Sequence, residues 1–178
     1  MKKYLLPRCL ILALLCALVS SCGYSARALL PSRFKTVHIA PFKNKISYTS
    51  DEARETYFPL LEIKIRNAVA DRFLFDGNLK VDNSEQADLL LKGELIGYQR
   101  DGLRYTENED VQEYRIRIEV SLQLWDSEKN ELLWEEPSFS ADTTYFLTGP
   151  LAKSETTAVE DALKDLARRV VERTIEDW

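Results

Sequence analysis

The segment EYRIRIEVSLQL, residues 113–124, decides the fold because its apolar and polar side chains alternate without interruption from Ile116 to Leu124. Successive side chains of a β-strand point to opposite faces, so this period of two places the apolar set on one face of a sheet. The same spacing places Arg115 and Arg117 on the other face. The segment therefore predicts a strand with one buried face and one polar face.

Three further strands are predicted around this segment. Each is a run of apolar or alternating residues bounded by turn-forming residues. Residues 99–110 are polar and irregular and predict a solvated loop, whereas residues 79–81 form a candidate short edge element. The three strands cover residues 37–39, 89–98 and 132–146, the last with an interruption at Pro137.

Two amphipathic helices are predicted by apolar residues that repeat at intervals of three and four. The first ends at Gly77, and the second follows a candidate capping box at Thr157 and Glu160 and runs nearly to Trp178. Their apolar stripes are Leu61, Ile65, Val69 and Phe73, and Val159, Leu163, Leu166 and Val170.

The resulting element order is β-α-β-β-β-α, which predicts a single α+β domain with two helices packed on one face of a four-stranded mixed β-sheet. Two helices do not easily cover both faces of such a sheet. The face that carries Arg115 and Arg117 is therefore either solvated or covered by a partner. A polar face of this kind suits the lumen of a β-barrel, whose inward side chains are hydrophilic.

The composition is that of an ordinary folded chain of 178 residues, 45% hydrophobic and 30% charged. The net charge of -5 argues against a generic nucleic-acid binder. Three cysteines and one histidine are too few for a zinc site of the usual kinds. No nucleophile motif is present, and His38 is more simply a strand residue than a catalytic base. We expect neither an enzyme nor a metal protein.

The first 22 residues have the features of a bacterial lipoprotein signal. Three positive charges precede an apolar run at residues 10–19, which is too short to span a bilayer. The sequence VSSC that ends at Cys22 resembles a lipobox, which implies cleavage of residues 1–21 and a diacylglycerol and an N-acyl chain on Cys22. No other cofactor is expected. Gly23 replaces the aspartate that favours inner-membrane retention in such proteins, so the resemblance implies an outer-membrane anchor. Residues 22–35 would then be the lipidated N-terminus and tether, and residues 36–178 the periplasmic domain.

Several short motifs occur in order along the chain, namely Cys22-Gly23-Tyr24, Pro41-Phe42, Ala87-Asp88, Glu113-Tyr114-Arg115 and Leu151-Ala152-Lys153. Together they resemble the LptE family of lipopolysaccharide-assembly lipoproteins. The resemblance implies a protein that plugs an LptD-type β-barrel, one to one, and helps that barrel to assemble. It also implies assistance in delivering lipopolysaccharide to the outer leaflet, with the domain on the periplasmic side or within the barrel lumen.

The same resemblance implies basic residues that bind lipopolysaccharide at two places. Lys153 matches the position just before the last helix. The other position falls near Glu107, where the closest cations are Arg100 and Arg104, which we take as further candidates. Arg115 and Arg117 are candidates for contact with the barrel.

Other functions stay open on the sequence alone. One is a different periplasmic lipoprotein adaptor, such as a peptidoglycan synthase activator or a secretion-channel subunit. A periplasmic enzyme and a free lipid carrier are less compatible with the sequence, because catalytic motifs and room for a large cavity are lacking.

Overall fold

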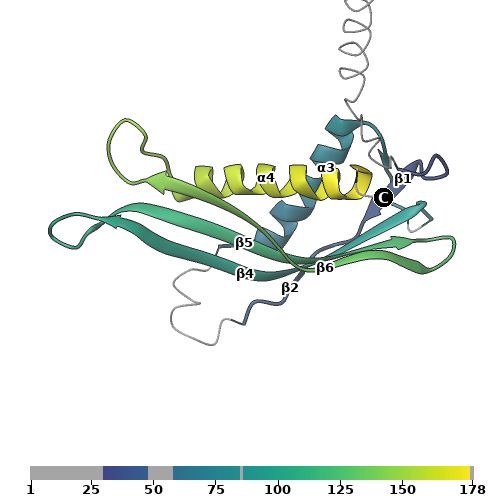
Figure 1. Cartoon of the computed structure of the whole chain (residues 1–178), viewed down its shortest axis with the longest axis horizontal. Helices are drawn as coiled ribbons and strands as arrows, with labels where there is room; N and C mark the ends of the chain where they lie inside the picture. Colours follow the sequence, from purple (N-terminus) through teal and green to yellow (C-terminus); the bar gives the residue numbers. More distant parts are fainter. Residues whose placement is uncertain (1–29, 48–57, 85, 177–178) are drawn as a thin grey trace, which may run out of the picture.

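A single mixed sheet carries two helices in the computed structural model, which describes residues 30–47, 58–84 and 86–176 (Figure 1). Cys22, with the predicted signal peptide and the first part of the tether, lies outside the described residues. The elements are β1 (Thr36–Ile39), β2 (Lys43–Asn44), α3 (Leu61–Asp76), β3 (Lys80–Val81), β4 (Leu89–Tyr105), β5 (Val111–Asp126), β6 (Glu131–Phe146) and α4 (Glu155–Glu176).

The sheet has the strand order β3-β1-β4-β5-β6, and β2 pairs with β4 beyond the end of β1. Strands β3 and β4 flank β1 in parallel, whereas β4, β5 and β6 form an antiparallel meander. Ile116, Ile118, Val120, Leu122 and Leu124 of β5 are all buried, which confirms the predicted burial of one face. The α+β class, the single domain and the mixed sheet are confirmed.

The sheet has six strands rather than the four predicted. The two additional strands, β2 and β3, are two residues long each, and β3 falls in the segment that the sequence marks as a candidate edge element. Both residues of β2 are exposed, so no apolar alternation distinguishes this strand from a loop. Its pairing with β4 joins segments that are distant in the sequence, so no local sequence pattern predicts it.

The prediction of a loop at residues 99–110 is wrong for its first seven residues, because β4 continues to Tyr105. The ladder with β5 extends through Asp101 paired with Arg115 and through Arg104 paired with Glu113, with bulges near the end. Most side chains in this part of β4 are exposed or half-buried on both faces. This part of β4 therefore lacks the alternation of apolar and polar residues that predicts a strand, although it forms the backbone hydrogen bonds of one.

Helix α3 buries the predicted stripe Leu61, Ile65, Val69 and Phe73 against the sheet. It ends at Gly77, whose φ of 78° lies in the left-handed region and whose N–H donates to the carbonyl of Phe73 at 3.0 Å. Glycine reaches this conformation without strain, which explains the predicted stop signal.

Helix α4 buries Val159, Leu163, Leu166 and Val170, as the sequence predicts. Its N-terminal cap is not the predicted pair of Thr157 and Glu160. Instead, the hydroxyl of Ser154 accepts a hydrogen bond from the N–H of Thr157 at 3.1 Å. An N-cap residue directly precedes the first helical residue and accepts from an N–H two or three positions later; since the helix begins at Glu155, Ser154 holds that position and Thr157 already lies inside the helix.

Both helices lie over the same face of the sheet, with α4 along β5 and β6 and α3 over β1, β3 and β4 (Figure 1). The core lies between these two layers. The N–H of Leu30 donates to the carbonyl of Ile175 at 3.2 Å, and Phe34 is buried, so the packed structure includes residues 30–35. Within the described ranges, no helix has the length and apolarity needed to cross a membrane.

We predict that Leu122→Asp lowers the free energy of unfolding by about 3 kcal/mol or more, because it places an unpaired carboxylate in the core. Leu122 is 1% exposed. Arg117→Ala, on the other face of the same strand, should leave the melting temperature nearly unchanged because Arg117 is solvent-exposed. Thermal and urea unfolding of both variants test the assignment of the two faces, and the reverse order of stabilities would contradict it.

Candidate functional site

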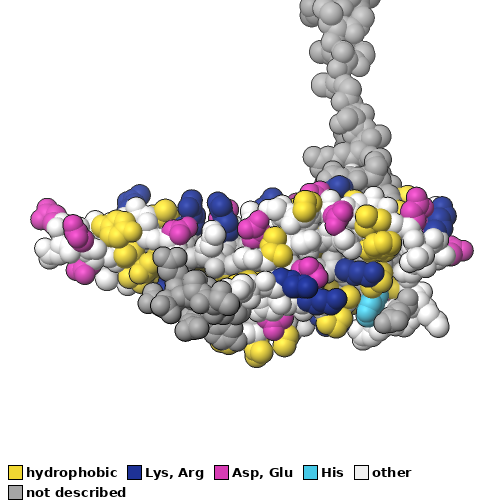
Figure 2. Space-filling view, turned by 90° about the horizontal axis from the view of Figure 1, so that it is seen from below, with side chains coloured by type: hydrophobic (Ala, Val, Ile, Leu, Met, Phe, Trp, Pro, Cys, Tyr) yellow, Lys and Arg dark blue, Asp and Glu magenta, His cyan; other side chains and the backbone are white. Residues whose placement is uncertain are grey.

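The sheet face opposite the helices is exposed within the described part of the chain. We call it the open face, and it consists of the side chains of β4, β5 and β6 that point away from α3 and α4. Figure 2 views the molecule from this side and shows basic and acidic side chains interspersed over it. The part of the face that the described residues form therefore carries charges of both signs side by side.

Arg115 and Arg117, the predicted partner-facing residues, both lie on the open face and are both paired across strands. Arg117 contacts the carboxylate of Asp142 at 2.7 Å, and Arg115 contacts Asp101 at 3.4 Å. The residues of each pair are directly opposite in the antiparallel ladders. The hydrogen bond to Asp142 raises the pKa of Arg117. These arginines are accessible but already neutralised.

Arg104 lies on the open face at the end of β4. Its Nε is 2.8 Å from the carboxylate of Glu113, a residue that is only 8% exposed. The guanidinium also lies 5.7 Å from the centre of the Phe146 ring. Because 67% of the Arg104 side chain is exposed, its remaining donors are accessible to an anion from solvent.

The other end of the open face carries contacts between amide, charged and aromatic side chains. Gln123 donates to Glu135 at 2.7 Å, and the indole N–H of Trp125 donates to Gln123 at 3.2 Å. The ammonium of Lys92 lies 4.6 Å from the Trp125 ring centre. The polar groups of the face therefore largely satisfy one another, which suits a surface that is wet or is covered by another hydrophilic surface.

Arg100, a candidate for binding lipopolysaccharide, lies on the helix-covered face instead. It forms an ion pair with Glu155, the first residue of α4, at 2.7 Å, and the hydroxyl of Tyr98 donates to the same carboxylate at 2.7 Å. Burial and the neighbouring Glu155 raise the pKa of Tyr98 far above its ordinary value. This cluster holds the N-terminus of α4 on the sheet.

Lys153 occupies the turn between β6 and α4. Its ammonium is 2.7 Å from the carboxylate of Asp161, two turns into the helix. That hydrogen bond lowers the pKa of Asp161. Lys164 also approaches Asp161, at 3.8 Å, but its side chain is 76% exposed.

The structure brings the segments of Arg104 and Lys153 together around Phe146, at the end of the molecule on the left of Figure 1. The Lys153 N–H donates to the Phe146 carbonyl at 3.1 Å, and Ala152 bridges to the same residue. We call this region the distal end. Hydrophobic side chains gather there in Figure 2. Those that are at least two-fifths exposed are Leu103, Tyr105, Leu147 and Leu151.

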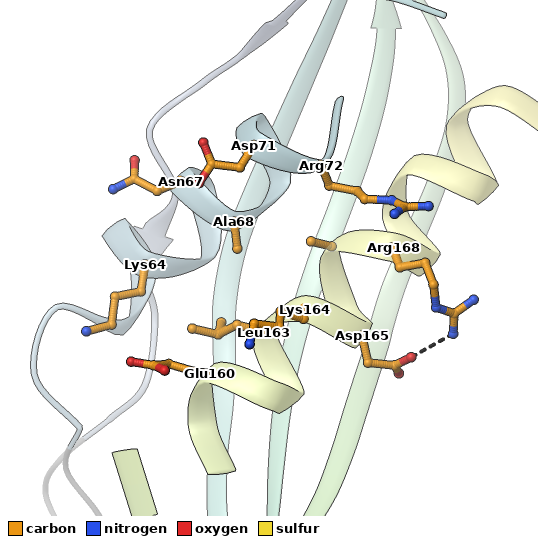
Figure 3. Close-up of a pocket in the computed structure, with 11 residues that line it drawn as sticks. Lys64, Asn67, Ala68, Asp71, Arg72, Glu160, Leu163, Lys164, Asp165 and Arg168 are labelled. Atoms are coloured by element: carbon orange, nitrogen blue, oxygen red, sulfur yellow. Dashed lines mark hydrogen bonds and ion pairs between the residues drawn. The ribbon is translucent and has the colours of Figure 1, made fainter. Parts of the chain in front are cut away.

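A groove of about 810 Å³ separates α3 from α4 on the side away from the sheet (Figure 3). Its floor includes Ala68, Leu163 and Ala167, and charged side chains of both signs form its rim, including the ion pair of Asp165 with Arg168. None of the candidate site residues predicted from the sequence lines it, although Leu163 of the predicted apolar stripe does. The groove combines small apolar residues with mixed charge and carries no arrangement specific to one ligand.

The sequence reasoning missed the acidic partners. Asp101, Glu113 and Asp142 neutralise the open-face arginines, and Glu155 and Asp161 neutralise Arg100 and Lys153. The first three become visible only once strand register is known, because the pairs are separated by 9 to 25 positions in the sequence. The last pair, eight residues apart across a turn and a helix start, has no common helical spacing either.

The chain is a single α+β domain whose sheet is covered by helices on one face and is polar on the other. A family model described as lipopolysaccharide-assembly, LptE, matches residues 34–174. The chain belongs to this family of lipopolysaccharide-assembly lipoproteins of the bacterial envelope. No curated protein matches the sequence.

Solved structures share the fold. A protein from Xanthomonas campestris aligns with a TM-score of 0.56 and 14% identity, over 80% of this chain and 84% of that chain. A hypothetical protein from Chlamydia trachomatis aligns with a TM-score of 0.52 and 12% identity, over 79% of this chain and 95% of that chain. At these identities the likeness concerns the fold.

We predict that Lys153→Met raises the pKa of Asp161 toward that of a free aspartate, because the variant removes the hydrogen bond that stabilises the carboxylate. Lys164→Met, which removes the more distant and more exposed cation, should raise this pKa less. Carboxyl chemical shifts followed by NMR during an acid titration measure both effects. Equal shifts in the two variants would contradict the pairing of Lys153 with Asp161.

Proposed function

We propose that this lipoprotein is held in the outer membrane by lipid chains on Cys22 and plugs an LptD-type β-barrel in a one-to-one complex. There it helps the barrel to assemble and assists the transport and insertion of lipopolysaccharide into the outer leaflet. Its role is binding and positioning rather than catalysis. Membership in the LptE family, over residues 34–174, is the observation that carries the proposal.

The open face supports the proposed contact with the barrel. The inner wall of a large β-barrel is hydrophilic, and a polar surface enters it without exposing apolar side chains. Arg115 and Arg117 are exposed there but paired, so neither arginine is an isolated charge when docking removes its hydration. Polar groups of the barrel then add hydrogen bonds to pairs that are already formed.

The distal end supports a contact with lipopolysaccharide. Leu147 and Leu151 provide apolar surface, and Arg104 and Lys153 provide cations beside it. An anionic amphiphile combines the same two properties, acyl chains and phosphate groups. We assign the lipid contact to Arg104 and Lys153, whereas Arg100 is engaged in holding α4 through Glu155.

We predict that a C-terminally tagged copy, extracted from outer membranes in mild detergent, retains a large β-barrel in stoichiometric amount. Arg117→Ala should reduce the amount of barrel that co-purifies, because it removes donors from the docking surface. The matched control is Arg168→Ala, which alters an arginine of similar exposure, also ion-paired, on α4.

Mass spectrometry of the retained proteins distinguishes the competing functions. A peptidoglycan synthase, or a ring of identical subunits, in place of the barrel would favour the alternative adaptor function. Equal loss of the barrel in the Arg117 and Arg168 variants would contradict docking through the open face while leaving the partner itself established.

We predict that substitutions of Lys153 and of its ion-pair partner Asp161 have opposite effects on lipopolysaccharide binding. Lys153→Ala should weaken binding about ten-fold, since a charge-assisted phosphate contact contributes about 1.5 kcal/mol or more. Asp161→Asn should strengthen it, because Lys153 no longer has to leave a carboxylate. Lys164→Ala is the control for general loss of positive charge. Titration of the lipidated protein with purified lipopolysaccharide measures all three, and no difference between the two lysine variants would exclude Lys153 from the contact.

A further inference from the structure

The last turn of α3 exposes two large apolar side chains. Leu74 is 64% exposed and Phe75 is 81% exposed, although the opposite face of the helix is fully buried. The guanidinium of Arg72 lies 5.3 Å from the centre of the Phe75 ring. We call these three residues the α3 tip. An exposed aromatic residue beside an aliphatic one and a cation is an amphiphilic surface without a partner in the described structure.

The α3 tip lies at the end of the domain where the described chain begins. After Gly77 the chain enters β3, and the N–H of Lys80 donates to the carbonyl of Lys35 at 2.8 Å. Five residues before Lys35, the N–H of Leu30 donates to the carbonyl of Ile175 near the end of α4, at 3.2 Å. The ends of both helices and the N-terminal segment therefore converge, and we call this region the proximal end.

The length of the tether limits the distance from the proximal end to the membrane. Cys22, the proposed site of lipidation, precedes Leu30 by eight residues. A fully extended chain spans at most about 3.6 Å per residue, so Leu30 lies no more than about 29 Å from Cys22. The proximal end is thereby held within reach of the leaflet that contains the lipid chains.

The distal end is not held in this way. Helix α4 has 22 residues, and a helix of that length spans about 33 Å. The distal end includes the turn that precedes the N-terminus of α4 and lies at the opposite end of the molecule from the first described residues (Figure 1). A short tether at one end therefore gives the domain a defined polarity relative to the membrane.

We propose that the α3 tip inserts into the membrane surface beside the lipid anchor, an inference that rests on the proposed lipidation of Cys22. Phe75 and Leu74 enter the boundary between headgroups and acyl chains, and Arg72 binds a lipid phosphate. Aromatic side chains favour this boundary, and an arginine matches phosphate geometry. The nearby carboxylate of Asp76 accepts two hydrogen bonds from Asn78, which directs it toward the turn.

The anchor explains why so small a surface is sufficient. Two apolar side chains and one cation would bind a bilayer only weakly from solution. Once the lipid chains are inserted, contact of the α3 tip with the same leaflet becomes intramolecular and occurs at high effective concentration. The contact adds orientation to an attachment that the acyl chains already provide.

The test measures the depth of an environment-sensitive fluorophore in lipid. With the proposed cleavage before Cys22 and acylation of its thiol, the protein keeps no free thiol, because Cys9 and Cys16 lie in the predicted signal peptide. Phe75→Cys therefore labels a single position. Leu151→Cys, a similarly exposed leucine at the distal end, is the matched control, and Ile63→Cys tests the N-terminal half of α3. Each purified lipidated protein is reconstituted in vesicles of phosphatidylethanolamine and phosphatidylglycerol, with or without phospholipids brominated on their acyl chains.

We expect a blue-shifted emission at position 75 that the brominated lipids quench, little quenching at position 63 and none at position 151. A blue shift at position 75 without quenching would show that protein, such as a second copy of the chain, covers the tip, and would overturn the proposal. Unshifted emission at position 75 would overturn it as well.

Flotation of the same vesicles separates this inference from the anchor. Lipidated protein that floats with the vesicles while position 75 stays in water would overturn the α3 contact alone. If the lipidated protein floats no better than Cys22→Ala, the proposed anchor fails, and the α3 contact fails with it.

Discussion

The rest of the structure depends on the central position of β5. Its 16 residues form antiparallel ladders with β4 on one side and β6 on the other. Its five buried aliphatic side chains, from Ile116 to Leu124, lie in the core beneath the helices. Burial of this stripe is the main hydrophobic contribution of the meander to the stability of the fold. The polar residues that alternate with it make the opposite face hydrophilic.

The one-sided cover has a direct consequence for recognition. Because both helices cover one face of the sheet, the other face is exposed. Charged side chains of neighbouring strands form pairs on it. A pair such as Arg117 and Asp142 contributes little to stability at the surface but keeps both side chains oriented. The open face is thus a rigid polar surface, whereas the apolar side chains available to partners are concentrated at the two ends of the molecule. The proposals place lipopolysaccharide at the distal end and the membrane at the proximal end.

The sequence predicted which face of the sheet most candidate residues occupy, but it predicted few of the contacts that they make. The period of two around Arg115 and Arg117 predicts that they share the polar face, and the structure places both there. Their partners were not predictable, because strand register is set by the whole ladder and not by neighbours in sequence. Arg100 and Arg104 are four residues apart on one strand, yet the bulge between Gly102 and Arg104 places them on opposite faces. Proximity in sequence was therefore a poor guide to the face of the sheet that each residue occupies.

Local physical chemistry is sufficient for the elements that bury a regular stripe. The helical repeat from Leu61 to Phe73, the stop at Gly77 and the alternation of β5 each depend on residues a few positions apart, so the sequence by itself determined the helices, the central strand and the α+β class. The tertiary structure alone decided the extension of β4 to Tyr105, the pairing of β2 and the meeting of Arg104 with Phe146. These features depend on backbone pairing and on contacts between segments that are distant in the sequence. Where the residues on both faces of a strand are exposed, the sequence shows no apolar alternation that would predict the pairing.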